Sequence, residues 1–188
     1  MPRILVVYYS RTGYTRTLAG ELVAALDADV DQLDDARDRC GVLGYLRCAH
    51  EALKKRTVQL RPPAYDPSHY DVVVLGTPVW AANMSSPLRS YVVAHRAQLK
   101  HVAFFCTQGG SGGEKVFRDL AELCGKTPLA TLAVNDRELN SRAYAQRLEP
   151  FAAIVKATAG APRSFANASS LEPSITDAAR APLAHRAP

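Results

Sequence analysis

Short apolar runs alternate with amphipathic segments along most of the chain. The runs are five or six residues long and are rich in valine, isoleucine and leucine. Runs of this length without a polar alternation are typical of parallel strands that are covered by helices on both faces. The predicted strands are 4–9, 72–76, 102–106 and 129–134, with a weaker candidate at 29–33.

Apolar residues between these runs recur at helical spacing. The first such segment places Leu18, Leu22 and Leu26 on one face, as expected for a helix that packs on a sheet. Prolines at 62, 63 and 67 break any helix and predict a loop before the third strand. Beyond the first, the predicted helices are 42–56, 87–99, 114–123 and 144–157.

Five strands in alternation with five helices predict one α/β domain. Such a sequence folds as a parallel sheet between two helical layers, and right-handed crossovers favour a doubly wound three-layer α/β/α sandwich. The domain is expected to span residues 1–158. Alanine, proline, serine and arginine dominate residues 159–188, so this tail is expected to be disordered because it can bury too little apolar surface.

Composition narrows the class of protein further. The 188 residues are 47% hydrophobic, which suits a single core, and the net charge of +5 is modest with both signs interspersed. No segment has the pattern of a nucleic-acid-binding element. No apolar run approaches the roughly 20 residues of a membrane span, and no signal peptide is recognisable. The four cysteines form neither a C-x-x-C pair nor a metal-ligand cluster. A cytoplasmic protein with reduced thiols and no bound metal is expected.

Chemistry is expected at the carboxyl ends of the strands, where open α/β sheets bind their ligands. The first of these loops has three hydroxyl side chains and a glycine directly before a helix. Free amides and the positive end of the helix dipole attract a phosphate group at such a place. A simple helix cap is the structural alternative, but a cap needs only one hydroxyl. The candidate phosphate-binding residues are Ser10, Arg11, Thr12, Gly13, Tyr14 and Thr15.

Two further loops suit a flat aromatic ligand. The loop after the third strand holds the only tryptophan of the chain, and an indole offers a large stacking surface. The loop after the fourth strand is rich in glycine, which lets the backbone approach a ligand closely. Neither a dinucleotide fingerprint nor a P-loop is present. The candidate ring contacts are Thr77, Pro78, Val79, Trp80 and Asn83, together with Thr107, Gln108, Gly109, Gly110 and Gly112.

These three loops resemble those of the flavodoxin-like superfamily. Residues 10–15 are similar to its T/S-x-T-G-x-T phosphate signature, and residues 76–80 and 107–112 are similar to its second and third flavin loops. The resemblance spans residues 3–158 and implies FMN as a noncovalent cofactor, bound by the residues named above, and a strand order of 2-1-3-4-5. Ala82 departs from the glycine that relatives often have, and the chain is basic where many flavodoxins are acidic.

Three functions follow from this resemblance. The first is an FMN-dependent oxidoreductase that takes electrons from NAD(P)H or a partner and passes them to a quinone-like or other small acceptor. The second is a one-electron shuttle that docks to redox partner proteins and has no substrate of its own. The third is a non-redox module that has lost the flavin. No catalytic acid or base can be assigned, because the histidines are scattered, and the oligomeric state stays open.

Overall fold

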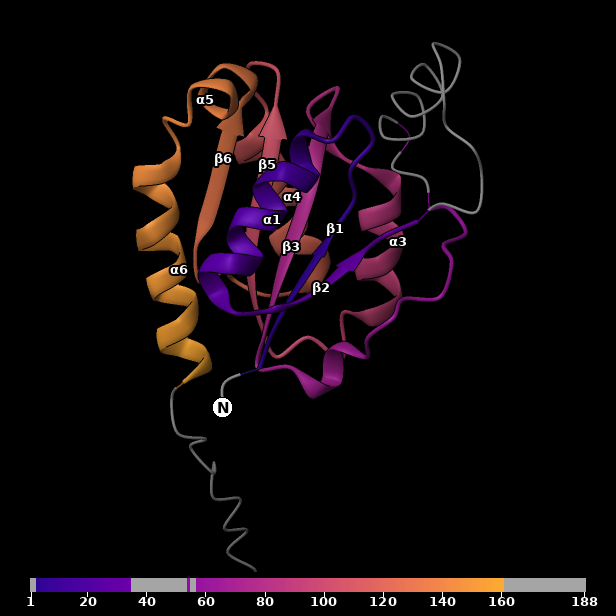
Figure 1. Cartoon of the computed structure of the whole chain (residues 1–188). Helices are drawn as coiled ribbons and strands as arrows, with labels where there is room; N and C mark the ends of the chain where they lie inside the picture. The colour runs from indigo at the N-terminus through magenta and orange to yellow at the C-terminus, as the bar shows by residue number, and fades with distance from the viewer. Residues whose placement is uncertain (1–2, 35–53, 55–56, 161–188) are drawn as a thin grey trace, which may run out of the picture.

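The computed structural model describes residues 3–34, 54 and 57–160. Five parallel strands lie in the order β2-β1-β3-β5-β6 (Figure 1). The predicted order 2-1-3-4-5 is therefore confirmed for the parallel strands, counted without the short β4, which pairs antiparallel with β3. The strands are β1 (Ile4–Tyr8), β2 (Asp29–Gln32), β3 (Val72–Trp80), β4 (Asn83–Met84), β5 (His101–Gln108) and β6 (Thr131–Asn135).

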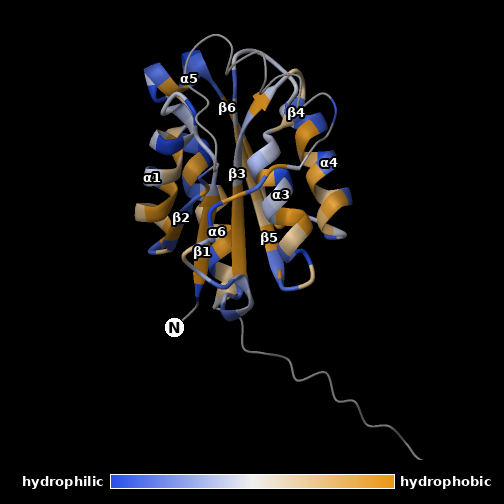
Figure 2. Ribbon diagram, turned by 90° about the vertical axis from the view of Figure 1, so that its right-hand side faces the viewer, coloured by the Kyte–Doolittle hydropathy of each residue, from blue (hydrophilic) through white to orange (hydrophobic). Residues whose placement is uncertain are grey.

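Helices cover both faces of the sheet, as predicted. Side chains at alternate positions of β1 point to opposite faces, so Val6 packs with helices α1 and α6 while Val7 packs with α3 and α4. Figure 2 shows α1 and α4 on opposite sides of the apolar strands. The helices are α1 (Tyr14–Leu26), α3 (Ser86–His95), α4 (Gly113–Cys124), α5 (Asp136–Ser141) and α6 (Ala145–Ala159), with a 3-10 turn, η1, at Pro67–His69.

Strand β3 is longer than predicted. Gly76 suggested its end, but the strand continues to Trp80 and turns back into β4. The reason for the glycine is packing: a Cβ atom at Gly76 would lie 2.0 Å from Cζ of Phe105, so the ring of Phe105 occupies the space of the missing side chain. What was predicted to be a loop after the third strand is thus largely a β-hairpin.

Other differences are a shifted helix end and one short helix that was not predicted. The helix predicted over 87–99 runs from Ser86 to His95, and a turn then brings the buried Leu99 back to the core. Helix α5 was not predicted; it is six residues long and begins with a capping box between Asn135 and Glu138. The predicted helix 42–56 and residues 161–188 of the predicted tail lie outside the described residues, apart from residue 54.

None of the described helices has the length and apolar character needed to cross a lipid bilayer.

Candidate functional site

A pocket of about 210 Å³ opens at the carboxyl ends of the strands. It lies at the ends of the neighbouring strands β1 and β3, which mark the switch point of this topology, and extends to β5 and β6. All three predicted loops contribute to its wall. The lining residues are Arg11, Thr12, Tyr14, Pro78, Val79, Trp80, Thr107, Gln108, Gly109 and Asp136.

The first loop is shaped by its own hydrogen bonds. The hydroxyl of Ser10 accepts from the amides of Gly13 and Arg16, each at 3.2 Å. Gly13 has φ +100°, a left-handed conformation that suits glycine, and nothing lies within 4 Å of its missing Cβ. The amides of Tyr14 and Thr15 begin α1, where a helix has no internal acceptors, and no acidic side chain lies in the first turn.

A buried hydrogen bond joins the first loop to the end of β5. The hydroxyls of Thr15 and Thr107 lie 2.8 Å apart, and both side chains are buried. Of these two threonines only Thr107 lines the pocket, and in the first loop the exposed Thr12 lines it while Thr15 does not. This bond fixes the start of α1 relative to the neighbouring strand.

The hairpin between β3 and β4 carries Trp80 into the pocket wall. The Trp80 ring meets Tyr9 edge to face, with centroids 5.7 Å apart. At the base of the hairpin, the Thr77 hydroxyl accepts from the Ser85 amide at 2.9 Å. Its single hydrogen has two acceptors within reach, the Pro78 carbonyl at 2.9 Å and the Ser85 hydroxyl at 3.0 Å. Asn83 donates to the carbonyl of Ala81 at 2.7 Å. Thr77 and Asn83 are buried, so they support the hairpin from within.

The third loop leads into α4 through two glycines. Gln108 Oε1 accepts from the amide of Gly113 at 2.8 Å, and a Cβ at Gly113 would lie 2.9 Å from both Cys106 Sγ and Gln108 Oε1. Gly112 has φ +109°, and its missing Cβ would lie 3.1 Å from Ala82 Cα. The glycine-rich turn therefore packs directly against the hairpin.

The sixteen predicted residues thus divide into two groups. Nine of them line the pocket. The other seven lie within the three loops that form the pocket, and they shape these loops from inside or lie beside the lining residues. This second group is Ser10, Gly13, Thr15, Thr77, Asn83, Gly110 and Gly112.

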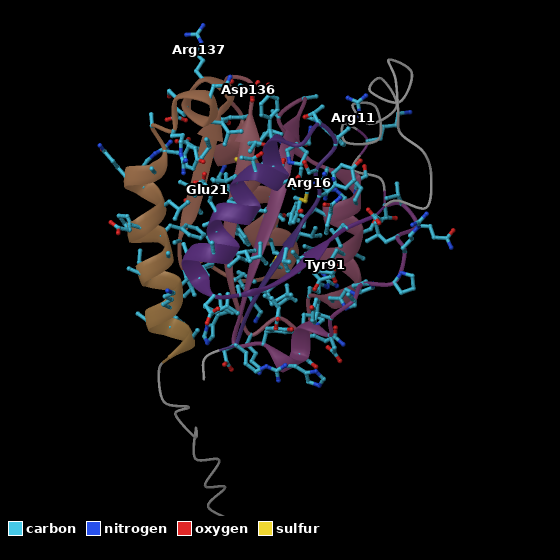
Figure 3. All side chains as sticks on the ribbon, in the orientation of Figure 1. Arg11, Arg16, Glu21, Tyr91, Asp136 and Arg137 are labelled. Carbon is cyan, nitrogen blue, oxygen red and sulfur yellow. The ribbon has the colours of Figure 1, made fainter. Side chains whose placement is uncertain are left out.

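Asp136 is a pocket residue that the sequence analysis missed. It follows β6 at the start of α5, and its Oδ2 lies 3.9 Å from the position of a Cβ at Gly109. Figure 3 places Asp136 and Arg11 at the same end of the molecule, on different elements. Asp136 could have been found from its position directly after the fifth parallel strand, because the carboxyl ends of parallel strands meet at the ligand site.

The thiol behind the pocket is inert. Cys106 is fully buried in β5, and this burial raises the pKa of its thiol to about 12. A thiol with such a pKa stays protonated at neutral pH and is a poor nucleophile. Cys106 is therefore a core residue.

Comparisons with known proteins place this geometry in context. No known family profile matches the chain, and no curated protein matches it. Among solved structures, a flavoprotein in complex with FMN from Lactobacillus acidophilus is 18% identical with a TM-score of 0.63, over 76% of this chain and 99% of the other. A two-electron reduced flavodoxin from Megasphaera elsdenii is 19% identical with a TM-score of 0.53, over 84% and 99%.

A flavodoxin, WrbA-like protein from Agrobacterium tumefaciens is also similar. It is 15% identical with a TM-score of 0.51, over 84% of this chain and 98% of the other. At these identities the likeness concerns the fold. The similar structures are matched over almost their full lengths, and the strand order of this chain is the 2-1-3-4-5 order of flavodoxin-like sheets. The chain therefore has the flavodoxin-like fold.

Proposed function

We propose that this protein binds FMN noncovalently in the pocket at the carboxyl ends of the strands and moves electrons through it. One observation carries the proposal: the first turn of α1, the hairpin with the only tryptophan and the glycine-rich turn before α4 all line a single pocket. A structural neighbour with FMN bound has the same fold.

The first loop fits a phosphate group. A phosphate dianion requires several donors and no nearby carboxylate, and it favours the positive end of a helix. The first turn of α1 offers the amides of Tyr14 and Thr15, the exposed hydroxyl of Thr12 and the cation of Arg11, without an acidic residue. We assign the phosphate to this turn.

The other two loops fit a planar ring. Trp80 provides an aromatic wall, while Pro78 and Val79 supply apolar surface beside it. Gly109 lines the same pocket without a side chain, and nothing lies within 4 Å of the missing Cβ of its neighbour Gly110. A pocket with an aromatic side chain and exposed backbone in its wall suits the ring system of a flavin.

The chemistry of the reaction comes from the cofactor: bound FMN can accept and release one or two electrons. The residues of the chain bind and orient it. The amides of the α1 turn hold the phosphate end, and the hairpin and the glycine-rich turn orient the ring and exclude water from its faces. Asp136 places a carboxylate at the pocket, on the side of β6.

We further propose that the protein is an oxidoreductase that uses NAD(P)H or a partner as electron donor and a quinone-like or other small molecule as acceptor. The net charge of +5 supports this, because a basic protein does not oppose the gain of negative charge that accompanies full reduction. The test is oxidation of NADPH or NADH by the FMN-loaded protein with a quinone acceptor. Turnover well above that of free FMN supports the assignment, and turnover equal to free FMN contradicts it.

A one-electron shuttle is the second candidate function. Arg11 lines the pocket, and the exposed Arg137 projects from the same end of the molecule (Figure 3). Cations around a redox site suit docking of an acidic partner protein. Stepwise anaerobic reduction separates the two functions: one-electron uptake in two well-separated steps supports the shuttle, and a single two-electron step supports the oxidoreductase. A colourless protein that binds no FMN would contradict both.

A further inference from the structure

The turn of the hairpin adopts an unfavourable backbone conformation. Ala81 and Ala82 have φ values of +47° and +55°, where an L-residue with a Cβ is strained. Two such residues in succession suit the tight turn of a hairpin, but glycine or asparagine normally occupies these positions. The conformation persists only if surrounding contacts impose it.

Lys115 supplies contacts of this kind from a distant element. Its ammonium group donates to the carbonyl of Ala82 at 3.2 Å and to Oδ1 of Asn83 at 3.1 Å. Its third donor bonds Oδ2 of Asp119 at 2.9 Å, one helical turn further along α4. All three hydrogens of the ammonium group are thus used, and two of them bind the hairpin turn.

Asp119, which bonds Lys115, also interacts electrostatically with a buried cation, Arg89. Arg89 of α3 is only 7% exposed, and its Nε and Nη2 have no hydrogen-bond partner within the described part of the chain. Burial lowers the pKa of its guanidinium, while the negative charge of Asp119 opposes this. Asp119 therefore lies between two cations, Lys115 and Arg89, and it lines a cleft between α3 and α4 with Arg89.

We propose that Lys115 is a positioning residue that locks the Trp80 hairpin into its ring-binding conformation, and that Asp119 orients Lys115 for this role. The expected effect on flavin affinity rests on the proposed FMN function. Lys115 holds Ala82 and Asn83, the two residues that follow Ala81 in the hairpin, and so fixes the Trp80 wall of the pocket before a ligand binds.

The test uses the full chain and four variants, of which the fourth, Asp119→Asn, serves in the redox measurement. Lys115→Met removes the donors but keeps much of the side-chain length, Lys115→Arg restores a charged donor, and Lys100→Met removes a lysine at the opposite end of the sheet as a control. Because Trp80 is the only tryptophan, its fluorescence reports the hairpin directly. The readouts are acrylamide quenching of Trp80 without flavin, and the Kd values for FMN and riboflavin.

We expect Lys115→Met to increase quenching of Trp80 without flavin and to raise both Kd values about tenfold, because charge-assisted hydrogen bonds to the hairpin are lost. Lys115→Arg should return both Kd values to within about threefold of wild type, and Lys100→Met should leave them unchanged. Wild-type quenching and Kd values in Lys115→Met would overturn the proposal.

A purely electrostatic role is separated by the redox potential. If Lys115 acted only as a nearby charge, Lys115→Met would lower the midpoint potential of bound FMN, Asp119→Asn would raise it, and Trp80 quenching would not change. That outcome overturns the positioning role. A positioning role requires both variants to loosen the hairpin. If wild-type protein binds no FMN, the proposed function fails, but quenching of Trp80 in the Lys115 variants still tests the clamp.

Discussion

The two ends of the pocket are built in different ways. At the phosphate end, the turn is shaped by hydrogen bonds within seven residues of chain, from Ser10 to Arg16, and its one left-handed residue is a glycine; a buried bond from Thr15 to Thr107 then anchors α1 to β5. The ring end is a hairpin whose left-handed residues are alanines, and its clamp, Lys115, lies more than thirty residues away in sequence. The first turn thus takes its shape from nearby residues, whereas the shape of the hairpin turn depends on tertiary packing.

This difference indicates how each end should respond to substitution. Loss of a donor at the phosphate end removes a contact to the ligand but leaves the turn intact. Loss of a support at the ring end changes the shape of the hairpin, which every ring-containing ligand senses. Riboflavin, which has the ring without the phosphate, therefore distinguishes the two ends, since only FMN engages both.

The largest effect is expected at the phosphate end. Thr12→Ala should raise the Kd for FMN by about 30-fold, because its exposed hydroxyl lines the pocket and hydrogen bonds to a charged phosphate are among the stronger ones. The Kd for riboflavin should change by less than about threefold. Flavin fluorescence titrations measure both. Thr17→Ala, whose exposed hydroxyl bonds the Gly13 carbonyl, is the control; an unchanged FMN Kd in Thr12→Ala would contradict the assignment.

The next effect concerns the contact between the glycine-rich turn and the hairpin. Gly112→Ala places a methyl group 3.1 Å from Ala82 Cα and strains a residue with φ +109°. We expect about a tenfold weaker affinity for both FMN and riboflavin, since the left-handed strain alone costs roughly 1–2 kcal/mol. Gly125→Ala, at the other end of α4 with φ +65° and nothing within 4 Å, is the matched control, because it adds a similar strain away from the pocket. A loss of FMN affinity with riboflavin affinity intact would show that Gly112 acts on the phosphate instead.

A smaller effect is expected from pH. A phosphate monoester loses its second negative charge as it protonates near pH 6, so FMN binding should weaken several-fold from pH 7 to pH 5 while riboflavin binding stays level. FMN binding weakens as the pH falls because the amides and the helix dipole favour the phosphate dianion over the monoanion. Parallel titrations at both pH values check this. Equal pH profiles for the two flavins would place the phosphate away from the α1 turn.

The smallest effect concerns the strain in the hairpin. Ala82→Gly relieves a left-handed residue at φ +55°, so we expect a gain in stability of about 0.5–1 kcal/mol after the entropy cost of glycine. Thermal unfolding measures it. Ala94→Gly, on the exposed part of helix α3, should instead destabilise the protein by about the same amount. If both variants destabilised the protein equally, the turn would not be strained.

The sequence was sufficient for features that depend on nearby residues. The core strands and the hydroxyl-rich turn before α1 can each be recognised within about ten residues of sequence, because apolar runs and helix-start signals are local. The strand order came from the resemblance, and the structure confirms it. The location of the three loops at one edge of the sheet was predicted from the α/β topology, and all three line one pocket.

Features made by distant residues were not predictable. Gly76 suggested a strand end, since nothing in its neighbourhood reveals that the Phe105 ring fills the space beside it. The roles of Lys115 and Asp136 depend on packing between α4 and the hairpin, and between β6 and the glycine-rich turn. The side chains of Thr77 and Asn83 are buried inside the hairpin that presents Trp80, a supporting role that their sequence positions did not indicate; that these residues contact the ring stays a prediction.

The most direct test of the central claim is a titration of the purified wild-type chain with FMN and with riboflavin, followed by flavin fluorescence and by Trp80 fluorescence. The account predicts that both ligands quench Trp80, because both place a ring beside it, and that FMN binds about 100-fold more tightly because the α1 turn holds its phosphate. Equal affinity for the two flavins, or no change in Trp80 fluorescence with either, would contradict it.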